Sequence, residues 1–213
     1  MDAHLVQAKL KKMRHADWCH RKFGSKIHKY KLNPAISEKD VAEFESRHSI
    51  RLPDEYRWFI TSIGNGGAGP DYGLEPLTHG IYSDLHYGES EGYIDPSMPF
   101  VLKEPWNMEL NHECSPKERR KFEEEYFSDK WVNGVLRICD RGCGMSINLV
   151  VNGPEYGNLW VDDRTSDYGI YPLNKNKKTT FWSWYSEWLN RVSGSVEVPS
   201  WMLWYKDDLG NYT

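Results

Sequence analysis

The chain has 213 residues, and its ten tryptophans, thirteen tyrosines and seven phenylalanines exclude a disordered polymer. Residues 1–33 hold nine lysines and arginines against two acids, a net charge of +7, whereas the remaining residues hold eighteen against twenty-nine, a net charge of −11. The acidic body argues against binding to nucleic acid and favours a basic partner.

No run of about twenty apolar residues is present, which excludes a transmembrane helix. The charged N-terminus is not followed by the apolar stretch of a signal peptide, so we expect a cytoplasmic protein that does not bind membranes. Four cysteines are too few and too unevenly spaced for a disulfide scaffold in a chain of this size.

The basic N-terminal segment, residues 1–33, is predicted to be a helical extension. Val6, Leu10 and Met13 recur at helical spacing within residues 4–18, with lysines between them. Such a helix either docks through its apolar side, leaving a basic face in solvent, or binds nucleic acid or an acidic surface. The docked helix is favoured, because a run of charged residues is more often a solvated face than a binding surface.

Residues typical of helix ends predict two further helices. Ser37 is a suitable N-cap for a helix that should end near His48. Pro53 is expected at the first position of the next helix, and the glycine-rich residues 64–67 end it.

The central part reads as long loops followed by one charged helix. Residues 68–114 are rich in Gly, Pro, Tyr and Asp. Ser115 and Glu118 then form a predicted capping box, with Pro116 at the first helical position, for a helix running to about Phe127.

The period of the apolar residues then changes to two. Strands are predicted at 135–138, 146–151 and 159–161, with an edge strand at 170–173, and Thr180 caps a final helix with an aromatic stripe. Short turns between strands indicate antiparallel pairing. We therefore predict an α+β fold: a mixed, largely antiparallel sheet flanked by helices.

Several segments, in this order and spacing, resemble one family, the SUKH immunity-protein superfamily, which also contains a yeast regulator of cell-wall glucan synthesis. They are residues 26–34, 36–45, 50–59, 64–70, 142–144, 149–153, 157–162 and 181–189. The resemblance implies a domain over 34–194, with a variable insert at 78–134 and a C-terminal tail at 195–213. It also implies that the chain is not an enzyme and needs no cofactor, and that bacterial members bind and neutralise a toxin from neighbouring cells.

Loop acids and aromatics are the candidate partner-binding residues. Clustered acids could pair with a basic toxin surface, form a solvated loop, or do acid–base or metal chemistry. Aromatics in loops could anchor an interface, with Tyr87 and Tyr93 as further examples. The candidate partner-binding residues are Glu89, Glu91, Asp95, Trp106, Asp162, Asp163, Asp167 and Tyr168.

Cysteine chemistry offers two weaker alternatives. Cys143 between two glycines resembles an exposed nucleophile, but no histidine lies close in sequence, so a small residue at a strand entrance is favoured. His112, Cys114, Cys139 and Cys143 lack the usual spacing of a zinc site, so no metal is expected.

The leading hypothesis is an immunity protein that occludes a cognate antibacterial toxin, one acting on nucleic acid or nucleotides, in a one-to-one complex. One alternative is a regulatory scaffold of the same fold. The other is an enzyme of unknown type, against which stands the lack of a recognisable catalytic constellation.

Overall fold

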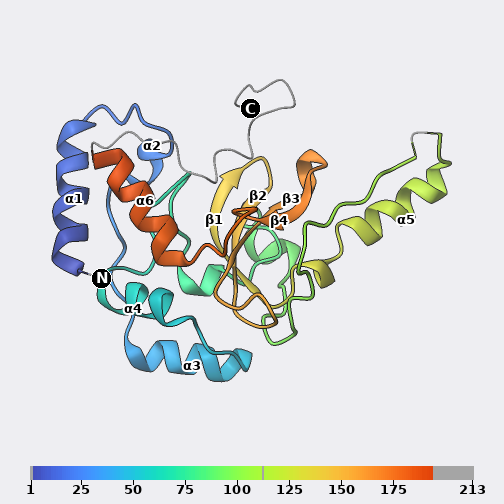
Figure 1. The fold of residues 1–213 in the computed structure, drawn as a ribbon, viewed down its shortest axis with the longest axis horizontal. Helices are drawn as coiled ribbons and strands as arrows, with labels where there is room; N and C mark the ends of the chain where they lie inside the picture. The colour runs from blue at the N-terminus through green and yellow to red at the C-terminus, as the bar shows by residue number, and fades with distance from the viewer. Residues whose placement is uncertain (1, 112, 194–213) are drawn as a thin grey trace.

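A computed structural model describes residues 2–111 and 113–193 (Figure 1). The C-terminal tail expected at 195–213 lies outside the described residues. Within them the chain forms a four-stranded sheet and six α-helices, which confirms the α+β prediction. The segments are α1 (Ala3–Ala16), α2 (Ser25–His28), α3 (Glu38–His48), α4 (Asp54–Ser62), α5 (Pro116–Tyr126), β1 (Val135–Gly142), β2 (Met145–Val150), β3 (Leu159–Asp163), β4 (Gly169–Pro172) and α6 (Phe181–Ser193).

The sheet is a meander in which each strand pairs with the next, in the order β1-β2-β3-β4. All three described pairings are antiparallel, so the expected mixed sheet has no parallel pair among these strands. Pro172 lies on β4 at the edge, where its missing N–H interrupts no central ladder.

One face of the sheet is covered by helices. Leu136, Ile147, Leu149 and Val161 point to this face and join the aromatic stripe of α6 in one core cluster. In α6, Tyr185 is fully buried and its hydroxyl donates to the Ala68 carbonyl, which ties the helix to the loop after α4.

The opposite face is divided between apolar and polar side chains. Val135, Val150, Trp160 and Ile170 form a second cluster, closed by the 94–106 loop segment. Further along the same strands the outward side chains become polar, and these residues build the site described below.

The N-terminal helix docks onto the body. The side chains of Val6, Leu10 and Met13 are buried, and α1 packs beside α6 in Figure 1. Lys22 Nζ donates to the Val192 carbonyl at 3.1 Å and fastens the following loop to α6. Of the two sequence-based alternatives, the structure shows the docked amphipathic helix.

Helix boundaries follow the capping signals closely. Ser37 accepts a hydrogen bond from the Asp40 amide, and Ser115 and Glu118 form the predicted capping box at the start of α5. Pro53 is the N-cap of α4 rather than its first residue, a shift of one position. Helix α5 projects from the sheet (Figure 1), and of its side chains only Tyr126 is buried.

We predict that Leu10→Ala lowers the free energy of unfolding by about 2–5 kcal/mol, because it leaves a cavity between α1 and the core. Urea denaturation measures the change, and Lys11→Ala, on the exposed side of the same helix, is the control and should stay within about 0.5 kcal/mol. Equal stability of the two variants would mean that α1 does not pack on the body.

Candidate functional site

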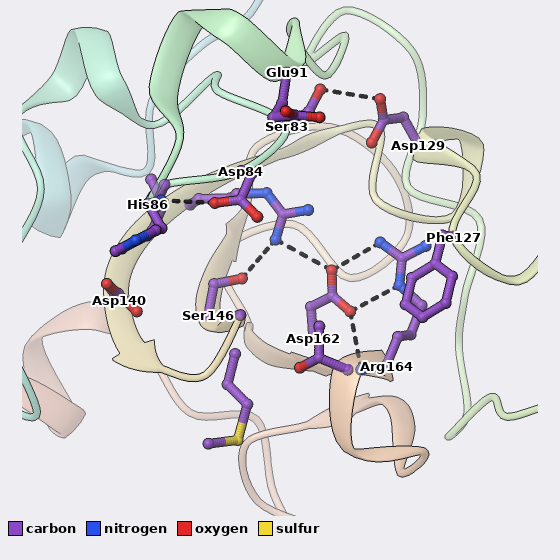
Figure 2. A pocket seen from close by; sticks show the side chains of 15 residues that line it. Ser83, Asp84, His86, Glu91, Phe127, Asp129, Asp140, Ser146, Asp162 and Arg164 are labelled. Atoms are coloured by element: carbon purple, nitrogen blue, oxygen red, sulfur yellow. Dashed lines mark hydrogen bonds and ion pairs between the residues drawn. The ribbon is translucent and has the colours of Figure 1, made fainter. Parts of the chain in front are cut away.

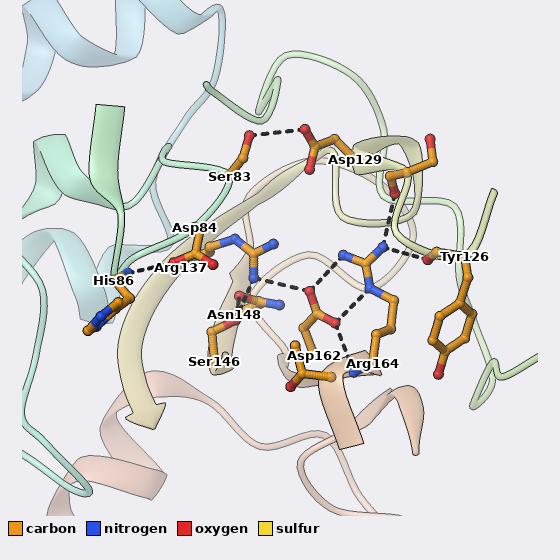
Figure 3. A network of polar contacts seen from close by, with 12 residues as sticks. Ser83, Asp84, His86, Tyr126, Asp129, Arg137, Ser146, Asn148, Asp162 and Arg164 are labelled. Atoms are coloured by element: carbon orange, nitrogen blue, oxygen red, sulfur yellow. Dashed lines mark hydrogen bonds and ion pairs between the residues drawn. The ribbon is translucent and has the colours of Figure 1, made fainter. Parts of the chain in front are cut away.

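A buried carboxylate between two guanidinium groups lies on the polar part of the sheet face. Arg164 Nε and Nη2 each donate to a different oxygen of Asp162 at 2.8 Å, and Arg137 Nη1 donates to Asp162 Oδ2 at 3.1 Å. All three side chains are about 95% buried, with exposures of 5–6%. Figure 3 shows that Asp162 faces both arginines.

The alternation of the strands brings these groups together. Ser146 on β2 pairs with Asp162 on β3, and Arg137 on β1 pairs with Asn148 on β2. Ser146 Oγ accepts from Arg137 Nη1 at 2.6 Å and donates to Asn148 Oδ1 at 3.0 Å. Four polar residues of three strands therefore form one network.

The network also holds the end of α5. Arg164 Nη1 donates to the carbonyls of Tyr126 and Ser128 at 2.9 and 3.0 Å. The Tyr126 carbonyl belongs to the last turn of α5, where the helix itself supplies no donor. The Ser128 carbonyl follows directly after the helix and also accepts from the Trp131 amide. The Arg164 side chain thus joins the sheet to the end of α5 and the turn that follows it.

Burial by itself would raise the pKa of Asp162, because it penalises the charged form. The hydrogen bonds from Arg164 and the positive charges of both arginines outweigh that penalty, and the pKa of Asp162 is lowered. The carboxylate is therefore ionised at neutral pH.

A polar pocket of about 360 Å³ opens over this network, between β1–β3 and the 83–91 segment (Figure 2). Its lining contains five carboxylates and two guanidinium groups, a formal net charge of −3 with His86 neutral. The charged residues are Asp84, Glu91, Asp129, Arg137, Asp140, Asp162 and Arg164.

A wider groove of about 790 Å³, here called the side groove, continues from the polar pocket. The two share Asp84, His86, Asp140, Gly144 and Thr165 in their linings. Ile27, Tyr72 and Tyr87 give the side groove an apolar wall, so the N-terminal extension contributes to it.

The β1–β2 turn forms another wall of the side groove. Gly142, Cys143 and Gly144 have φ angles of 88°, 53° and 78°, a region that glycine tolerates best. A Cβ on Gly144 would also lie 2.6 Å from Thr165 Cγ2. The tight turn explains the two glycines, and Cys143 is exposed there with no hydrogen bond to a histidine among the described residues.

A family model matches residues 35–191, most of the chain, and describes the SMI1 / KNR4 family (SUKH-1). The chain belongs to this family. It includes toxin-immunity proteins, and its members are generally non-catalytic immunity or regulatory proteins. Searches of curated proteins and of solved structures found no match.

Two of the predicted partner-binding residues in this SUKH-1 chain do not lie on an exposed loop. Asp162 and Asp163 end strand β3, and their exposures are 4% and 3%. Asp162 is held by arginines, and Asp163 Oδ2 accepts from the Tyr171 hydroxyl at 3.0 Å. Strand β3 extends two residues beyond its apolar residues 159–161, so both aspartates belong to the sheet and not to the following loop.

Trp106 is also part of the fold rather than a free anchor. It is half-buried and stacks on Trp131 and Tyr126, with ring centroids 4.3 and 5.5 Å away. Its backbone pairs with Ile170 beside β4. The neighbouring Asp167 and Tyr168 are exposed, as expected of loop residues.

The remaining predicted residues lie on the 87–95 segment and are exposed. Glu91 reaches the polar pocket, and Glu89 Oε1 accepts from the Tyr82 hydroxyl at 3.3 Å. Asp95 Oδ1 accepts from the amide and hydroxyl of Ser97, so it also stabilises a turn. Tyr87 and Tyr93 are 64% and 54% exposed.

Sequence reasoning missed most of the pocket. Asp84, Asp129 and Asp140 are separated along the chain, and only the fold gathers them. A signal existed for the network, because Ser146, Asn148 and Asp162 alternate with apolar strand residues, which indicates a polar stripe on one sheet face.

No group of three or more His, Cys, Asp or Glu side chains within residues 2–111 and 113–193 is arranged to hold a metal ion. Of the four residues considered as zinc ligands, His112 lies outside the described residues, and Cys139 is buried. None of the described helices is long and apolar enough to span a membrane.

We predict that Asp162→Asn lowers the free energy of unfolding by about 3–5 kcal/mol, because it leaves two buried guanidinium groups without a counter-charge. Urea denaturation measures the change. Asp167→Asn, on an exposed acid five residues away, should stay within about 0.5 kcal/mol. Similar losses in both variants would contradict the role given to Asp162.

The lowered pKa of Asp162 also predicts a pH dependence. The unfolded carboxyl has a pKa of about 3.9, so in acid the unfolded chain binds a proton that the native chain does not, and stability falls with pH below about 4. Between pH 5 and 3 the wild-type protein should lose stability more steeply than Asp162→Asn, with Asp167→Asn following the wild type. Parallel curves for wild type and Asp162→Asn would show that this carboxyl does not carry the dependence.

Proposed function

We propose that this SUKH-1 protein is an immunity protein, which binds a cognate antibacterial toxin acting on nucleic acid or nucleotides and occludes its active site in a one-to-one complex. The observation that carries the proposal is a family that includes immunity proteins combined with an acid-lined pocket beside exposed aromatic side chains. An enzyme that acts on nucleic acid has a basic cleft, to which such a surface is complementary.

The proposed interface comprises the exposed residues of the 87–95 segment and of the β3–β4 connection. Glu89, Glu91 and Asp95 supply negative charge, which speeds association with a basic partner. Tyr87 and Tyr168, 64% and 65% exposed, supply the large amphipathic side chains that anchor protein interfaces.

The two alternative functions make different demands. A regulatory scaffold of the same fold would bind several cellular proteins, none of them toxic. An enzyme would need a reacting group, and Cys143 with His86 in the same side groove is the pair to examine. Because no hydrogen bond joins them in the described structure, the binding function is favoured.

The test has two stages. The tagged chain is used to capture partners from a lysate of its native organism, and each captured protein is then expressed alone and with the chain in sensitive bacteria. We predict that one partner stops growth when expressed alone, and that co-expression restores growth at a molar ratio near one.

A set of harmless partners would favour the scaffold. Turnover of nucleotide, ester or peptide substrates that disappears in Cys143→Ala would favour the enzyme. Either result would replace the immunity function.

A further inference from the structure

We propose that the polar pocket and the side groove receive one arginine or lysine side chain, presented by an extended segment of the protein partner. The inference rests on the proposed function, since it names the part of the toxin that this site would hold. The geometry comes first: the pocket and groove share five lining residues, so a chain lying in the groove can send a side chain into the pocket.

The carboxylates around the pocket keep acceptor atoms for a cation. Asp84 Oδ1 accepts from the amides of His86 and Tyr87, Asp140 Oδ1 from the Gly142 amide, and Asp129 Oδ2 from the Ser83 hydroxyl. The second oxygen of each has no hydrogen-bond donor among the described residues. Figure 2 shows these carboxylates around the buried network.

The arginines of the pocket do not turn it into an anion site. Arg164 directs all three guanidinium nitrogens to Asp162 or to backbone carbonyls, and Arg137 Nη1 is held by Ser146 and Asp162. An anion would therefore meet four rim carboxylates, whereas an ammonium or guanidinium group would be attracted by them.

One buried donor indicates that the ligand also carries an acceptor. Arg137 is 4% exposed and lines the pocket, and its Nη2, unlike its Nη1, makes no hydrogen bond among the described residues. A buried N–H without an acceptor is costly, so a ligand that brings one is favoured. A peptide segment brings both groups: a side-chain cation for the acids and a backbone carbonyl for Arg137.

The apolar wall fits the aliphatic part of such a side chain. Ile27 and Tyr87 are 65% and 64% exposed beside the acidic rim, and Tyr72 is supported by Phe23 at a centroid distance of 5.0 Å. Arginine and lysine stems cover apolar surface while their charged ends reach polar groups. A small inorganic cation would use only the acids, and the described residues offer no metal-binding group.

The experiment titrates the isotope-labelled full chain with acetyl-Gly-Arg-Gly-amide and follows backbone amide shifts by NMR. The control ligand carries citrulline, an uncharged analogue of arginine. We expect saturable shifts in the 84–91 segment and around 140–144 with the arginine peptide, and none that saturate with the citrulline peptide.

A double variant, Asp84→Asn with Asp140→Asn, should weaken binding of the arginine peptide at least about tenfold, because it removes two charges. Asparagine keeps the Oδ1 acceptor that each turn uses, so folding is preserved. The matched control is Glu123→Gln with Glu124→Gln, two exposed acids of α5 outside the lining, which should bind like the wild type.

Unchanged binding in the Asp84/Asp140 variant, shifts that never saturate, or saturable binding of inorganic phosphate instead would overturn the inference. The captured toxin separates it from the proposed function. A toxin still bound with full affinity by the Asp84/Asp140 variant would overturn the groove and leave immunity standing. Charge-dependent peptide binding without any toxin partner would leave the cation site standing and remove immunity.

Discussion

The ion pairs between Asp162 and its two arginines are the interaction on which the polar half of this molecule depends. Three charges withdrawn from water would be costly if any were left unpaired. Both carboxylate oxygens are used, and the remaining Arg164 nitrogen reaches the Tyr126 carbonyl at the end of α5. The same contacts therefore stabilise buried charge and fasten the loop-rich part of the chain to the sheet.

The sheet face that carries this network has an apolar end and a polar end, although the side chains alternate regularly along each strand. At one end its outward residues are apolar and close over Trp160, which packs edge-on against Phe100. At the other end they are polar, so the face cannot be sealed by apolar side chains there, and a pocket remains. The helix-covered face supplies the main core, which leaves this face free to hold a site.

The side groove is assembled from parts of the chain that lie far apart in sequence. Ile27 comes from the docked N-terminal segment, Asp84 from the central loops and Gly144 from the β1–β2 turn. A family fold of this kind can change its binding surface through loops while the sheet and helices stay in place.

The sequence by itself determined the local structure of this protein. Ser37, Pro53 and the Ser115 capping box mark helix starts, and the change of period at Val135 marks the sheet, because caps and periodicity act over a few neighbouring residues. The family motifs were likewise readable from the residues alone. Only the tertiary structure decided which acids are available: it buried Asp162 and Asp163 and gathered Asp84, Asp129 and Asp140. Burial depends on strand register and on what packs across the sheet, and neither is encoded within a few residues of the acid itself.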